Sequence, residues 1–150
     1  MDDAELETIL LDGSKAIAGD IKWSEDEDHS PAMEFRAAVD SQAGWPLFVR
    51  GSYNPLAEAL TFALILKPVG RIYALDLGKD HHNPTCQQTG EKHKHRWSEQ
   101  FSDKQAYVPE DITAGVDDPV AIWEQFCAEA KIEHNGKLET PQTVQKELFL

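Results

Sequence analysis

The hydrophobic pattern of the first third of the chain predicts one helix followed by strands. Apolar residues recur on one helical face over residues 3–11, where Asp2 or Asp3 can act as the N-cap. From Ile17 onward the period changes to two, which is typical of half-buried strands. The alternation is clearest over residues 33–39, and another short strand is expected over residues 45–50.

An ambiguous apolar segment occupies the middle of the chain. Residues 56–66 also fit one face of a helix, but turn residues bracket them, so we favour a strand over residues 59–66. The turn KPVGR then predicts a hairpin leading to a strand over residues 71–77. A further strand is expected over about residues 92–98.

The last part of the chain carries the clearest helix signal. Asp118 is a good N-cap, Pro119 suits the first helical position, and the apolar stripe that follows extends to Ala130. Asn135-Gly136 is expected to end this helix, and a short last helix is expected from Thr140. Together the elements predict one α+β domain over residues 1–150. Its core would be a single antiparallel meander of five or six strands, with an N-terminal helix and C-terminal helices.

Charge and composition restrict the function classes. The net charge of −13 argues against general nucleic-acid binding, which relies on many lysine and arginine contacts to phosphate. No apolar run approaches the length of a membrane span, and the acidic N-terminus is unlike a signal peptide. Two cysteines do not make a disulfide framework, so a cytoplasmic protein with reduced thiols is expected.

Four of the six histidines lie within HHNPTCQQTGEKHKHRW, residues 81–97. Residues 70–110 carry six acidic and six basic residues, so this stretch is a neutral island between two acidic flanks. If residues 92–98 form a strand, His93 and His95 share one of its faces. A hairpin would bring His81 and His82 towards them.

Three interpretations of this histidine stretch stay open. His82, Cys86, His93 and His95 could bind a zinc-like divalent metal, which accepts imidazole and thiolate ligands in tetrahedral geometry. Without a metal, His81, His93 and His95 could act as acid–base groups on a phosphodiester, because an imidazole titrates near pH 6.5. The third interpretation is a structural histidine network on a solvated strand.

The same stretch resembles an uncharacterised family of short prokaryotic proteins, a domain of unknown function. Its pattern is H-x-N-P, then H-x-H, then D-[KR]-x-A-aromatic, which residues 81–84, 93–95 and 103–107 match here. The resemblance covers residues 76–110, and Cys86 is not part of the pattern. It implies that this stretch is the shared site, and that related genes are often found in mobile or defence-related surroundings.

Two functional hypotheses from different classes follow. The first is a small hydrolase that acts on a phosphodiester or nucleotide through the histidine site, with a phosphate-containing ligand as its partner molecule. The second is a non-catalytic acidic inhibitor or antitoxin-like protein that binds a basic protein partner through its negative surface. Mutation of His93 and His95 would abolish the activity of a hydrolase but leave an inhibitor unaffected. Rising salt would instead weaken the binding of an inhibitor to its basic partner.

Overall fold

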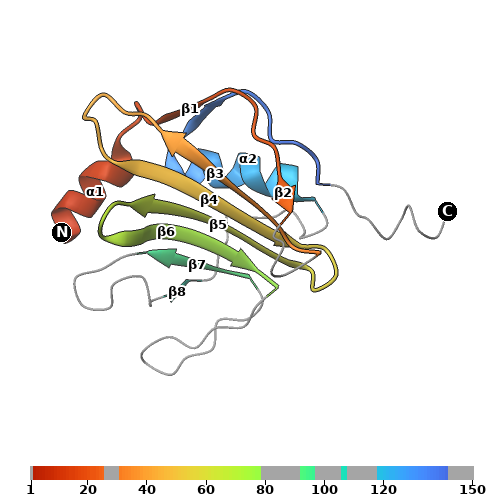
Figure 1. Cartoon of the computed structure of the whole chain (residues 1–150). Coiled ribbons are helices and arrows are strands. Elements are labelled where there is room, and N and C mark those ends of the chain that lie inside the picture. The colour runs from red at the N-terminus through yellow and green to blue at the C-terminus, as the bar shows by residue number, and fades with distance from the viewer. Residues whose placement is uncertain (1, 26–30, 79–91, 97–105, 108–117, 142–150) are drawn as a thin grey trace.

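The computed structural model describes residues 2–25, 31–78, 92–96, 106–107 and 118–141, with residues 92–96 and 106–107 described by their backbone alone. Two helices and nine strands follow one another in this part of the chain (Figure 1). In chain order they are α1 (Asp3–Leu11), β1 (Ala16–Ala18), β2 (Ser24–Glu25), β3 (Met33–Val39), β4 (Leu47–Asn54), β5 (Ala59–Leu66), β6 (Gly70–Leu77), β7 (Lys92–Arg96), β8 (Ala106–Tyr107), α2 (Pro119–Ala130) and β9 (Glu133–Asn135).

The main sheet is an antiparallel meander in which each strand pairs with the next one in sequence, in the order β2-β3-β4-β5-β6-β7-β8. This confirms the predicted α+β fold, and the strand preferred for residues 59–66 is β5. The two outermost strands contain only two residues each. A separate parallel pair, β1 with β9, was not predicted, because both strands are too short to show a period.

Both predicted helices begin at the expected caps. The Asp2 carboxylate accepts a hydrogen bond from the Glu5 amide at 2.7 Å, and the Asp118 carboxylate accepts one from the Ala121 amide at 3.2 Å. However, α2 ends at Ala130 and not at Asn135-Gly136. Its C-cap is Lys131, which has the left-handed conformation with φ of 56°. The residues that follow are needed for β9. The last helix expected from Thr140 falls almost wholly outside the described residues.

One face of the sheet packs against α2, as Figure 1 shows. The Trp123 ring lies between sheet aromatics, with its centroid 5.6 Å from that of Phe35 and 5.1 Å from that of Phe62. Phe126, one turn later, contacts Phe62 and Tyr73. Burial of these rings stabilises the contact between helix and sheet, since each aromatic side chain removes a large apolar area from water. Neither described helix is long and apolar enough to cross a membrane.

Gly51 makes this aromatic packing possible. It stands opposite Phe35 on the neighbouring strand, and a β-carbon at position 51 would overlap the Phe35 ring. The ring therefore lies flat over the bare backbone of β4. It cannot easily move away, because Trp23, Phe62 and Trp123 pack around it.

We expect Gly51→Ala to lower the free energy of unfolding by about 1–3 kcal/mol, the usual range for an overpacked core. Gly13→Ala is the matched control, because a β-carbon there meets nothing within 4 Å. Urea unfolding followed by tryptophan fluorescence measures both variants. The double variant Gly51→Ala/Phe35→Leu should lose less unfolding free energy than the two single variants lose together, because the smaller side chain relieves the overlap. Strict additivity of the two losses would contradict the proposed overlap.

The C-terminus of α1 is closed by a buried lysine. Lys15 is fully buried, and its Nζ donates hydrogen bonds to the carbonyl oxygens of Ile9 at 2.6 Å and Leu10 at 2.9 Å. The last carbonyls of a helix lack the amide donors of a following turn, and the ammonium supplies donors to these two. The Ile9 oxygen also accepts a hydrogen bond from the Asp12 amide at 3.3 Å. Burial lowers the pKa of Lys15 from 10.5 to about 8, although Asp12 opposes this shift.

This pKa shift predicts how stability depends on pH. Between pH 8 and 10.5 the folded chain has already released the Lys15 proton while the unfolded chain still holds it, so the unfolded state binds more protons. Stability from this group therefore rises with pH in that window, by at most about 1.4 kcal/mol per pH unit. Lys15→Met should remove this component. The test compares unfolding free energies of the two proteins from pH 7.5 to 10.5, and identical slopes would refute it.

Candidate functional site

The face of the sheet opposite α2 carries most of the polar side chains of the meander. We call it the outer face and define it by alternate residues of four strands: Glu34, Arg36, Phe48, Arg50, Ser52, Thr61, Ala63, Ile65, Ala74 and Asp76. Residues directly opposite each other in antiparallel strands share a face, so these residues form rows across the sheet. The rows are exposed at β3 and buried at Ala63, Ala74 and Asp76.

The backbone register fixes where the two histidines of β7 stand. His93 is opposite Asp76 and His95 is opposite Ala74, so both positions extend rows of the outer face. The strand predicted over residues 92–98 is thus present as β7. The lysine and arginine positions of β7 are instead opposite Tyr73, Leu75 and Leu77, on the α2 side of the sheet. Three other candidate residues, His81, His82 and Cys86, lie outside the described residues.

Asp76 is the residue that the sequence analysis missed. The residue is 6% exposed, and it is the only buried acidic residue in the described part of the chain. The Thr61 hydroxyl donates a hydrogen bond to Asp76 Oδ1 at 2.5 Å, and Arg71 Nη1 lies 3.9 Å from Oδ2. A buried carboxylate needs such partners, because the loss of hydration is costly. The signal was present in the sequence as one aspartate within the apolar strand IYALDL.

A metal site is not assembled by the described residues. They contain no group of three or more histidine, cysteine, aspartate or glutamate side chains that could hold an ion. Of the proposed ligands, His82 and Cys86 lie beyond these residues, and His93 and His95 are described by backbone alone. The zinc-like site therefore stays a prediction.

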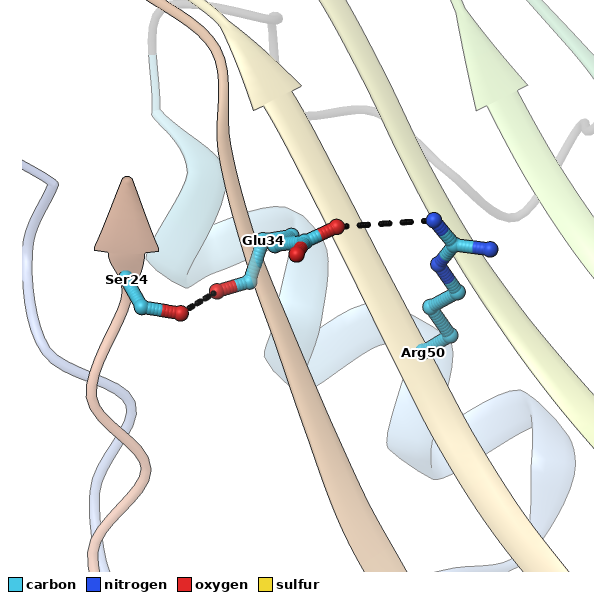
Figure 2. A network of polar contacts seen from close by, with 3 residues as sticks. All are labelled: Ser24, Glu34 and Arg50. Atoms are coloured by element: carbon cyan, nitrogen blue, oxygen red, sulfur yellow. Dashed lines mark hydrogen bonds and ion pairs between the residues drawn. The ribbon is translucent and has the colours of Figure 1, made fainter. Parts of the chain in front are cut away.

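The outer face also has a hollow of about 500 Å³ over β3 and β4, lined by Ser24, Glu34, Phe35, Arg36, Phe48, Arg50 and Ile65. Figure 2 shows its polar side, where Arg50 Nη2 lies 3.4 Å from a Glu34 carboxylate oxygen. The Ser24 hydroxyl donates to the Glu34 carbonyl oxygen at 3.0 Å (Figure 2). The Arg36 guanidinium lies over the Phe48 ring, 4.1 Å from its centroid.

A second hollow, of about 570 Å³, lies beside α2 and β9 and includes Trp123, Cys127 and His134 in its lining. The Trp123 indole N–H donates to His134 Nδ1 at 3.0 Å, so this nitrogen carries no proton. His134 Nε2 then donates to the Gly19 carbonyl oxygen at 2.8 Å. His134 thus joins α2 to the β1 segment, a structural role that fits its lack of a functional signal in the sequence.

Comparison with known proteins places the chain in a family. A model of a family of unknown function, DUF6978, matches residues 1–132, so the chain belongs to that family. This confirms the expected membership in a family without an assigned activity, and the match extends well beyond residues 76–110. The chain has no significant match among curated proteins or among solved structures.

Cys127 should be an unreactive thiol in the folded protein. Burial, together with the charge of Glu124, raises its pKa to about 12, and the thiolate is the reactive form. In a Cys86→Ser variant, a disulfide reagent at pH 8 should modify Cys127 only after denaturant is added. Absorbance of the released thiol measures the rate, and rapid modification of the native protein would contradict the burial of this side chain.

Proposed function

We propose that the protein is a small hydrolase of a phosphodiester or nucleotide, with His93 and His95 as acid–base groups and Asp76 as the positioning residue for His93. The observation that supports it most is the register of β6 and β7, which sets His93 directly across from the only buried carboxylate in the described residues. Directly opposed residues have β-carbons about 4.5–5.5 Å apart, a spacing that lets a carboxylate accept an imidazole N–H.

The proposed role of Asp76 is electrostatic and geometric. A carboxylate hydrogen-bonded to one imidazole nitrogen fixes the tautomer and leaves the other nitrogen to accept a proton. Thr61 and Arg71 hold the two Asp76 oxygens from neighbouring positions, which limits how the carboxylate can rotate. A carboxylate kept in one orientation can position an imidazole, whereas a solvated one would not.

The proposed reaction needs two proton transfers. One imidazole takes a proton from the attacking water as the water oxygen bonds to phosphorus. The second, protonated imidazole gives its proton to the leaving oxygen as the phosphorus–oxygen bond breaks. His93 and His95 occupy alternate positions of one strand, so a single substrate could reach both. His81 would add a third acid–base group, as the sequence pattern predicts.

We expect His93→Ala/His95→Ala to lower phosphodiester hydrolysis by at least about a hundredfold, the lower end of what acid–base groups contribute. Asp76→Asn should lower kcat at least tenfold and shift the acidic limb of the pH–rate profile to lower pH. A carboxylate stabilises the imidazolium, and an amide does not. Bis(p-nitrophenyl) phosphate and 2′,3′-cyclic nucleotides are suitable substrates.

Asp40→Asn is the matched control, since this exposed aspartate directly follows β3, outside the proposed acid–base site, and should leave hydrolysis unchanged. Circular dichroism must show that every variant keeps the wild-type fold. Equal activity of the wild type and the double histidine variant would refute the proposal. The acidic-inhibitor hypothesis would then be tested by salt-sensitive capture of a basic protein partner.

A further inference from the structure

The outer face gathers positive charge around one aromatic ring, which is unexpected in a chain of net charge −13. Arg36 and Lys67 both lie over Phe48, with their charged atoms 4.1 and 5.2 Å from the ring centroid. Arg50 stands directly opposite Arg36 in the register of β3 and β4. Two basic residues, Arg36 and Arg50, therefore line one hollow, and a third, Lys67, lies over the Phe48 ring beside it.

This arrangement has an energetic cost that local packing does not remove. Like charges directly opposite each other in an antiparallel pair destabilise the sheet. Among the described residues, Glu34 is the only acidic one that lines the hollow, and its ion pair with Arg50 is exposed, with side chains 41% and 58% accessible. Exposed ion pairs contribute little to stability, so Glu34 only partly offsets the charge of the two arginines.

We propose that this hollow, between Arg36, Phe48 and Arg50, binds a nucleotide or a nucleotide-like phosphate ester. A volume of about 500 Å³ is within the range of small-molecule pockets. Arg50 supplies a planar fork that matches the oxygens of a phosphate, and Glu34 would release it on binding. The Arg36 guanidinium, already over Phe48, offers its outer side to a flat ring, since arginine stacks on aromatic groups.

The apolar part of the hollow favours a nucleotide over a simple inorganic anion. Phe48 and Ile65 are half-buried and form part of its lining, so a ring can remove apolar area from water there. An anion without a ring would use the arginines alone. Binding here does not require hydrolysis at β7, because none of the lining residues in the described part of the chain belongs to the proposed acid–base site.

Calorimetric titration of the full chain with the β,γ-imido analogue of ATP, at low salt, tests this inference. We expect saturable binding that Arg36→Gln/Arg50→Gln weakens at least tenfold. Lys22→Gln/Lys137→Gln is the matched control, because it removes the same charge from two exposed lysines outside the hollow and should change the affinity less than twofold. His93→Ala/His95→Ala should bind as the wild type does, even if the proposed hydrolase activity is absent.

Three outcomes would overturn the inference. The first is no binding to the wild type. The second is an equal loss of affinity in the arginine and lysine variants, which would indicate diffuse charge attraction and not a site. The third is binding of tripolyphosphate as tightly as the nucleotide analogue, together with no effect of Phe48→Leu. That result would show that no ring is bound against Phe48 and Arg36.

Discussion

The packing of α2 against one face of the meander is the constraint on which the rest of the structure depends. Trp123 and Phe126 meet Phe35 and Phe62 edge to face or tilted, and Gly51 leaves the space that Phe35 occupies. Because side chains alternate along a strand, this one choice of buried face assigns every other residue of β3–β6 to the outer face. A shift of register by one residue would exchange the two faces.

This constraint explains why polar groups from distant parts of the chain form rows on the outer face. One row runs Glu34, Ser52, Thr61, Asp76 and ends at the position of His93; the next runs Arg36, Arg50, Ala63, Ala74 and ends at the position of His95. The first row changes from half-buried at Glu34 and Ser52 to buried at Asp76. The second changes from exposed and cationic at Arg36 and Arg50 to buried at Ala63 and Ala74. A phosphate-bearing ligand and an acid–base pair could therefore use the same face without sharing residues.

The sequence was sufficient for the elements whose patterns are long. The predictions of strands over residues 33–39 and 59–66 and of a helix that starts at Asp118-Pro119 are correct. Strands of seven and eight residues and a capped helix carry redundant signals. The pairing of β1 with β9 could not be predicted from the sequence. Each strand has only three residues, too few to show a period, and the two are more than a hundred positions apart. Asp76 was missed for a related reason: only the register shows that His93 is its neighbour.

Net charge was the least informative property of the sequence, because it sums over positions that the fold separates. The acidic residues that give −13 include those of α1 and of the chain ends, whereas β3 and β4 bring Arg36 and Arg50 together from fourteen residues apart. Coulomb interactions between exposed groups fall off within about 10 Å at ordinary ionic strength, so a ligand at the hollow responds mainly to its own surroundings. We expect the remaining acidic surface to repel long polyanions and to act much less on a single nucleotide. An acidic chain can thus discourage nucleic acid and still accept a small phosphate ester on its outer face.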